Sequence, residues 1–245
     1  MFTGFSEDAI AFLRDIRIHD DKDWFEAHKK TYTDKLYHPM KELCAEVAAP
    51  FSKKYFMMSK TGRIYTDPNF PPYRKYRDNM WFVVRHEAWD WSKTPSLFFD
   101  LTGDGAVLGF KITHPAAPVM EKFRQRIVSD GGEFIKLVKK LERAGMVIGG
   151  DEYKRQKPCE SDEARRFYQK KALSITMTLP VDSDILYKPE LAKYIGKVFR
   201  QLLPVNDMFD EFALQADAEK LAAKAAASEP SAPEMPKAPD RDFMW

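Results

Sequence analysis

The sequence contains little cysteine and no long apolar run. Its 245 residues include two cysteines, Cys44 and Cys159, which lie far apart in unrelated contexts. We therefore expect neither a disulfide nor a cysteine metal site, and a reducing cytoplasm is the default location. No apolar stretch approaches the roughly 18 to 20 residues that a membrane helix needs, so we expect no membrane association. The first ten residues also lack a basic region followed by an apolar one, the pattern of a signal peptide.

A strong net charge is missing as well. The 39 basic and 37 acidic side chains leave a net charge of +2, which is too small for general attraction to a polyanion. The five histidines are scattered and give no metal-ligand spacing. The chain also has no Walker loop, no dinucleotide-binding glycine motif and no G-x-S-x-G nucleophile elbow. We therefore predict no metal site and no cofactor, and nucleic-acid binding is an unfavoured alternative.

Apolar residues make up 44% of the chain and aromatic residues 13%, enough for a sizeable core. Ser6 fits the N-cap of a first helix, whose apolar stripe runs from Ile10 to Ile16. A second stripe, from Phe25 to Val47, has helical spacing and is interrupted by Pro39. Because an interior proline costs about 3 kcal/mol, we expect a kink there or a new helix with Pro39 in its first turn.

Short apolar runs rich in aromatic and β-branched residues predict strands in the middle of the chain. Residues 80–86 read MWFVVRH, and residues 96–101 read SLFFDL. Residues 101–112 predict a hairpin with a glycine-rich turn. Residues 173–179 alternate apolar and polar side chains, which predicts a strand with one buried face and one face in water. A further strand is expected at residues 63–67, RIYTD.

Later helices are predicted for residues 116–128, 132–144 and 160–171, and for an amphipathic segment after Pro189 that continues past Pro204. Helices thus flank a block of adjacent strands. The fold class that this order favours is α+β, an antiparallel sheet of about five strands flanked by N-terminal and C-terminal helices.

The end of the chain differs in composition from the rest. Proline recurs at every third or fourth residue from Pro230 to Pro239, so we expect an extended, disordered Ala/Pro-rich tail. The chain ends in DFMW, an apolar tip that is either a tolerated terminus or a docking motif. Residues 228–245 are therefore a candidate segment for binding a protein partner.

Residues 62–79 crowd cations and phenols around three prolines. If residues 63–67 are extended, their side chains alternate, so Arg63, Tyr65 and Asp67 share one face and Ile64 points into the core. The prolines stiffen this segment. Arginine donates hydrogen bonds in a planar fork suited to carboxylate or phosphate, and tyrosine hydroxyls add donors.

These properties predict an anion site in the segment. The candidate ligand-binding residues are Arg63, Tyr65, Asp67, Arg74, Lys75 and Tyr76. Asp67 is also the candidate catalytic residue, because it can orient Arg63 or act as a base, and whether the protein is an enzyme stays open. The competing interpretation is a solvated loop whose surface ion pairs contribute about 0–1 kcal/mol each.

Three segments carry a resemblance to a known family. They are the N-terminal region with the Trp24-Phe25 pair and Pro39, the stretch GFKITHP, and the stretch FRQLLPVNDMF. With these segments the chain resembles the bacterial domain-of-unknown-function family 2461 over about residues 2–215. The resemblance implies a single globular domain over residues 1–215, followed by a helical extension and tail at residues 216–245. It implies no activity.

The family's arginine-rich signature, Arg-x-x-Arg-Asp-x-Arg-Phe, is incomplete in this chain. Arg63, Asp67 and Phe70 match it, whereas Thr66 and Asn69 stand in place of two arginines. The lysine and tyrosine that follow in the family correspond to Arg74 or Lys75 and to Tyr76.

Three functions are consistent with these observations. The favoured one is binding of, or action on, a small phosphate- or carboxylate-bearing ligand in an Arg/Lys/Tyr-lined site. The second is protein interaction through the tail. The third, weak nucleic-acid binding, draws on the basic and aromatic residues of the loop and is opposed by the small net charge.

Overall fold

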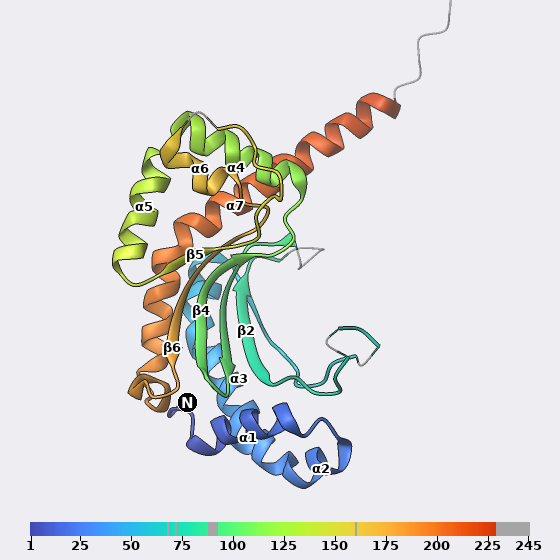
Figure 1. Cartoon of the computed structure of the whole chain (residues 1–245), viewed down its shortest axis with the longest axis vertical. Helices are drawn as coiled ribbons and strands as arrows, with labels where there is room; N and C mark the ends of the chain where they lie inside the picture. Colours follow the sequence, from blue (N-terminus) through green and yellow to red (C-terminus); the bar gives the residue numbers. More distant parts are fainter. Residues whose placement is uncertain (68, 72, 88–92, 160, 229–245) are drawn as a thin grey trace, which may run out of the picture.

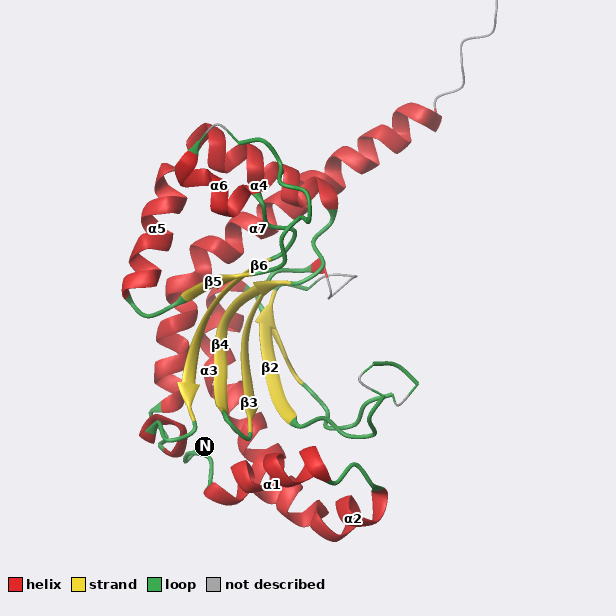
Figure 2. Cartoon of the chain, viewed as in Figure 1, coloured by secondary structure: helices red, strands yellow, loops and turns green. Residues whose placement is uncertain are grey.

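The computed structural model describes residues 1–67, 69–71, 73–87, 93–159 and 161–228. Within these residues, six antiparallel strands form one sheet in the order β1-β2-β3-β4-β6-β5 (Figure 2). The strands are β1 (Met58–Thr61), β2 (Asn79–Arg85), β3 (Ser96–Thr102), β4 (Gly105–Ile112), β5 (Val147–Gly149) and β6 (Leu173–Pro180). The predicted α+β class with an antiparallel sheet is confirmed.

Helices precede, interrupt and follow the strands along the chain (Figure 1). They are α1 (Glu7–Ile18), α2 (Lys22–Thr31), the π-helix η1 (Tyr32–Tyr37), α3 (His38–Tyr55), α4 (Ala117–Asp130), α5 (Gly132–Arg143), α6 (Asp162–Tyr168), the 3₁₀-helix η3 (Asp184–Tyr187) and α7 (Leu191–Ser228). None of the helices in the described part of the chain has the length and apolar content needed to span a bilayer.

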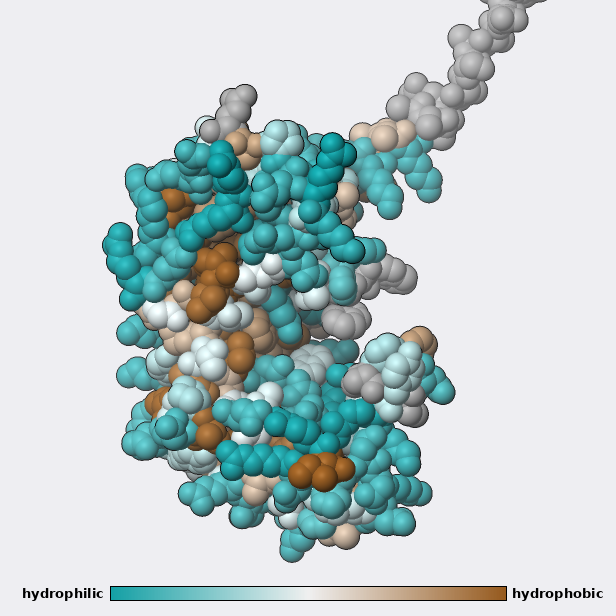
Figure 3. Space-filling view, in the orientation of Figure 1, coloured by the Kyte–Doolittle hydropathy of each residue, from teal (hydrophilic) through white to brown (hydrophobic). Residues whose placement is uncertain are grey.

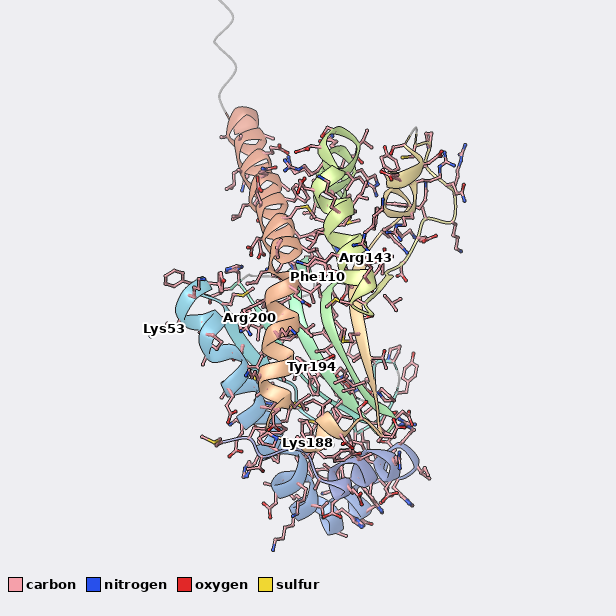
Figure 4. All side chains as sticks on the ribbon, turned by 90° about the vertical axis from the view of Figure 1, so that its left-hand side faces the viewer. Lys53, Phe110, Arg143, Lys188, Tyr194 and Arg200 are labelled. Carbon is pink, nitrogen blue, oxygen red and sulfur yellow. The ribbon has the colours of Figure 1, made fainter. Side chains whose placement is uncertain are left out.

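Two helices cover one face of the sheet. Helix α3 contacts β1 and β2, and α7 contacts β3 and β4. Phe110 of β4 lies beneath α7 and meets Phe209 with ring centroids 5.6 Å apart (Figure 4). Phe199 of α7 contacts both Phe82 of β2, at 6.3 Å, and Phe51 of α3, at 6.0 Å. This aromatic layer joins the sheet to both helices.

The other face of the sheet is concave and turns away from α3 and α7 (Figure 2). Because side chains alternate along a strand, burying one set of positions presents the other set on this side. We call it the open face. Its side chains on the three central strands are those of Asn79, Trp81, Val83, Arg85, Ser96, Phe98, Asp100, Val107 and Lys111.

Two prolines affect the helices in different ways. The predicted helix with Pro39 in its first turn is confirmed, since Pro39 lies at the start of α3. Proline has no N–H and its ring clashes with the preceding turn, and that turn is the π-helix η1, in which the His38 N–H bonds to the Thr33 carbonyl. Helix α7 continues through Pro204, as predicted, because the residues around it, such as Leu203 and Val205, are buried.

Other local predictions are confirmed with small shifts. Ser6 caps α1 by accepting a hydrogen bond from the Ala9 N–H at 3.3 Å. The hairpin of β3 and β4 turns at Gly103 and Asp104. Gly105, the first residue of β4, has φ 134°, and a side chain there would run into the Leu179 carbonyl of β6. Glycine is therefore required at the point where the hairpin enters the sheet.

Two strand predictions are corrected. Residues 63–67 are not a strand of the sheet; the edge strand is β1, and Tyr65 forms a single isolated bridge with Tyr76. The three-residue β5, for which no strand was predicted, adds a sixth strand to the expected five by pairing with β6. A strand of three residues is too short to show the period-two alternation on which the prediction depends.

A histidine clamp fixes the end of β2 to both covering helices. His86 Nδ1 lies 2.7 Å from Asp210 Oδ2 of α7, and Nε2 lies 2.9 Å from the Tyr55 carbonyl oxygen of α3. Because both ring nitrogens face acceptors, the doubly protonated ring is favoured. Burial lowers the pKa of His86, but the hydrogen bond and charge of Asp210 outweigh it, so the pKa is raised above its ordinary value.

This clamp makes stability depend on pH. A histidine whose folded-state pKa is raised stabilises the fold fully below its unfolded pKa of about 6.5, and the contribution disappears as pH rises through the raised value. We expect the free energy of unfolding, measured with urea between pH 6 and 8.5, to fall with pH more steeply in the wild type than in His86→Gln. Equal slopes in the two proteins would contradict the clamp.

Candidate functional site

The predicted site segment, residues 62–79, is a long excursion between β1 and β2 that projects from the sheet (Figure 1), and its last residue, Asn79, begins β2. Its two arms pair through the bridge of Tyr65 and Tyr76, and the Thr66 N–H donates to the Lys75 carbonyl at 3.0 Å. Ile64 is fully buried, as the alternation predicted. Pro68 and Pro72 lie outside the described residues, so the prediction that these prolines stiffen the segment stays a prediction.

Asp20, between α1 and α2, fastens this excursion to the body. Its carboxylate accepts hydrogen bonds from the backbone N–H groups of Lys75 and Tyr76, each at 3.0 Å. Arg74 adds a second attachment, because its Nη2 donates to the Ile16 carbonyl at 2.7 Å and its Nε lies 4.0 Å from Asp20. The guanidinium of Arg74 is thus engaged in holding the loop against α1.

The remaining predicted residues have different environments. Tyr76 is 5% exposed and stacks on Phe25 at 4.4 Å, whereas Tyr65 is half exposed and meets the same ring edge-on at 5.5 Å. Asp67 is exposed and accepts bonds from the backbone and side chain of Asn69 at 2.9 and 3.0 Å, which closes a local turn.

Of the six predicted residues, the structure brings Tyr65 and Tyr76 into contact, with ring centroids 5.7 Å apart. Arg63 and Lys75 are exposed on the excursion, and no described side chain forms an ion pair with either. Half of the predicted set, Asp67, Arg74 and Tyr76, has structural partners that account for its position. The other half is Arg63, Tyr65 and Lys75, whose exposed side chains form no hydrogen bond or ion pair within the described residues.

A second group of polar residues lies on the open face and was not predicted. Asp100 of β3 is held by the Asn79 amide, whose Nδ2 donates to both carboxylate oxygens at 2.8 and 3.0 Å. Burial raises the pKa of Asp100, although the Asn79 hydrogen bonds and the charge of Lys111 oppose this shift. Lys111 of β4 extends over the Phe98 ring, with Nζ 4.2 Å from the centroid, and burial lowers its pKa.

Arg85, the last residue of β2, is the most unusual member of the group. It is 9% exposed, and its Nη1 is sealed from solvent without a hydrogen-bond partner. No described carboxylate pairs with its guanidinium, and burial lowers its pKa. Arginine stays charged in proteins, so this cation has one nitrogen cut off from water and no counter-charge among the described residues. Such a group destabilises the fold unless something else binds it.

The register places the two open-face cations in one cross-strand row. Val84 pairs with Leu97, so the next residue of β2, Arg85, lies opposite Ser96. Ser96 also pairs with Lys111 on its other side, so Arg85 and Lys111 flank Ser96. Two strand spacings separate their backbones, roughly 10 Å. Long side chains from both positions can therefore reach one small ligand. Perturbed ionisable groups in a concave surface are typical of functional sites.

A signal for these residues was present in the sequence. Arg85, Asp100 and Lys111 are charged residues inside otherwise apolar strand runs, VVRH, LFFDL and LGFKI. A charged side chain at such a position either faces water or takes part in a specific interaction. The sequence alone does not say which, because the strand pairing that brings the three together is not encoded locally.

A cavity of about 410 Å³ lies between α1, α2 and η1. Its lining mixes both signs of charge around an aromatic floor of Phe12 and Trp24, and includes Asp8, Asp15, Asp34, His28, Lys30 and Lys35. None of the three unpartnered buried polar atoms in the described residues belongs to this lining. Nor do those residues contain a group of three His, Cys, Asp or Glu side chains placed to hold a metal ion.

Comparison with known proteins places the chain in a family without a described activity. The family model described as "Conserved hypothetical protein (DUF2461)" matches residues 8–208. The match includes every strand and all the open-face residues. No curated protein matches the chain.

The Asp20 attachment can be tested by mutation. Hydrogen bonds to a charged group contribute about 1.5–3 kcal/mol, so we expect Asp20→Ala to lower the free energy of unfolding by an amount in that range. We also expect faster tryptic cleavage within residues 74–77. Asp67→Ala, in the same loop but bonded within its own turn, is the matched control and should change stability by less than about 0.5 kcal/mol. Similar losses in the two variants would contradict the attachment.

Proposed function

The chain belongs to the DUF2461 family, and we propose that it binds a small phosphate- or carboxylate-bearing ligand on the open face of its sheet, with Arg85 as the principal contact. The single observation that carries this proposal is that Nη1 of Arg85 is buried without a hydrogen-bond partner among the described residues. An anionic ligand supplies the missing charge and accepts two parallel hydrogen bonds from the guanidinium fork.

The surroundings of Arg85 support a small ligand. Lys111 adds a second cation in the same row, and its Nζ lies over the buried ring of Phe98. On the face shown in Figure 3, apolar surface occurs as separate patches among hydrophilic side chains.

The loop residues have a secondary role in this proposal. Arg63, Tyr65 and Lys75 remain candidate ligand contacts, because they are exposed on the excursion that leads from the end of β1 to the start of β2. Arg85 lies at the opposite end of β2. Asp67, Arg74 and Tyr76 would then act by holding that excursion in place. Asp67 remains a candidate catalytic residue, and the proposal requires no catalysis.

A ligand panel tests the proposal. Thermal unfolding is measured with phosphate, sugar phosphates, nucleotides, carboxylates and short oligonucleotides. A ligand at about a hundred times its dissociation constant stabilises by roughly 2.7 kcal/mol, which is about 5–10 °C for a chain of this length. We expect one anion class to give such a shift, and Arg85→Met to abolish it.

The control variant is Arg63→Met, which removes an exposed cation from the predicted loop. A shift that survives in Arg85→Met and is lost in Arg63→Met would move the site to the loop. A flat response to the whole panel would contradict the proposal. A shift with oligonucleotides alone, falling steeply with salt, would favour nucleic-acid binding.

Self-association is a second candidate function, favoured by the end of α7. This helix extends beyond the body of the protein (Figure 1), and Leu214 and Leu221 on it are 72% and 68% exposed. Leucines seven residues apart on an exposed helix are typical of helix pairing, here with a second copy of the chain. The predicted tail motif at residues 229–245 lies outside the described residues.

Sedimentation tests the self-association. We expect the full-length chain to form dimers, and the double variant Leu214→Glu, Leu221→Glu to be monomeric with unchanged stability, because both side chains are exposed. A wild-type chain that is monomeric at high concentration would exclude this function.

A further inference from the structure

Lys111 differs from the surface lysines of this protein in its surroundings. Its Nζ lies over the Phe98 ring, and no described carboxylate is close enough to form an ion pair with it. Burial lowers its pKa, so a larger fraction of the amine is neutral near pH 7 than for an ordinary lysine. A neutral lysine amine in an apolar setting is a nucleophile toward carbonyl carbon.

A proton donor and acceptor lies on the neighbouring strand. Asp100 is on the same face as Lys111, and each charge acts on the other. Asn79 holds both carboxylate oxygens of Asp100, which fixes its orientation. Because burial raises the pKa of Asp100, its carboxyl is a better proton donor near neutral pH than an exposed aspartic acid.

Arg85 supplies the third element of the arrangement. It lies in the same cross-strand row as Lys111 with Ser96 between them, so an anion held by Arg85 places the rest of a small ligand near Nζ. Among the described residues this row therefore combines an anion-binding cation and an amine, and Asp100, on the same face of β3 four residues beyond Ser96, supplies an acid. That combination suits a ligand that carries both an anionic group and a carbonyl.

We propose that the ligand of the open face is an oxo acid or an oxo phosphate, and that Lys111 forms an imine with its carbonyl carbon. This inference rests on the proposed function, because Arg85 must bind the anionic group. The neutral amine attacks the carbonyl carbon while the carbonyl oxygen takes the proton of Asp100, and the resulting ammonium returns one proton to the Asp100 carboxylate, giving a neutral carbinolamine. Asp100 then protonates the hydroxyl, which leaves as water, and the nitrogen lone pair forms the carbon–nitrogen double bond of a protonated imine. One water is released, and nothing is oxidised or reduced.

Borohydride trapping tests the imine. The full chain is incubated with pyruvate, glyoxylate or dihydroxyacetone phosphate, reduced with sodium borohydride, and digested for mass spectrometry. With at least one probe we expect a single secondary amine on the peptide that contains Lys111, and none in Lys111→Met. Lys60→Met is the matched control, since Lys60 is exposed on the edge strand β1, and it should leave the adduct unchanged. No adduct with any probe, or equal labelling of Lys60 and Lys111, would overturn the inference.

The failure of this inference is distinguishable from failure of anion binding. Thermal stabilisation by the same three probes, lost in Arg85→Met, with no adduct at Lys111 would leave the anion site standing and exclude the imine. If neither the thermal stabilisation nor the adduct is observed, both the anion site and the imine are excluded. An adduct at Lys111 that forms equally well in Arg85→Met would exclude recognition of the anionic group by Arg85.

A pH profile separates a chemical role of Lys111 from mere accessibility. We expect the trapping rate to reach half its maximum below pH 10.5, the ordinary pKa of lysine, because the neutral amine is the reactive form. Asp100→Asn should slow trapping about a hundredfold while leaving the adduct on the same residue, since proton transfer by a positioned group contributes about that much. A half-point at or above pH 10.5 would contradict the role assigned to the buried amine.

Discussion

The structure depends on the aromatic layer between the sheet and helices α3 and α7. Phe82, Phe99 and Phe110 come from three adjacent strands, and each is fully buried on the helix-covered face. Burying a side chain of this size contributes roughly 1.5–3 kcal/mol, so this layer fixes the register of the central strands. A slip of one residue would move these three phenylalanines to the open face and bury the polar side chains. The polar side chains therefore lie on the open face because the apolar positions of the same strands are buried on the covered face.

The same constraint explains how charged residues come to lie together. Arg85, Asp100 and Lys111 occupy alternate positions in strands whose other positions are committed to the core. Their spacing follows from strand pairing and tolerates little adjustment, which is the condition for a preorganised site. The excursion at residues 62–79 is anchored separately, by Asp20 and Arg74 against the first two helices. The scaffold and the loop are thus held by independent interactions.

The sequence predicts the elements of this fold better than their assembly. Local patterns identified β6 by its alternation, the β3–β4 hairpin by its turn, and the start of α3 by Pro39. They missed β5, which is too short to alternate, and misplaced the edge strand, whose sequence Met58–Thr61 is mostly polar. The candidate site shows the same limit. The cations of the predicted loop segment are adjacent in sequence, so the sequence predicts a site there. Arg85 and Lys111 come into one row only through the pairing of β2 and β4 with β3.

The most direct test of the account is the free energy of unfolding of Arg85→Met in the absence of any ligand. A buried cation without a partner destabilises the fold, so its replacement by an apolar side chain of similar length should stabilise the unliganded protein by about 1 kcal/mol or more. Arg63→Met, at an exposed position, should stay within about 0.5 kcal/mol of the wild type. Stabilisation by Arg85→Met would mean that the residue is kept for a ligand. Destabilisation of similar size would mean that Arg85 has a structural partner in the protein, and would contradict the account.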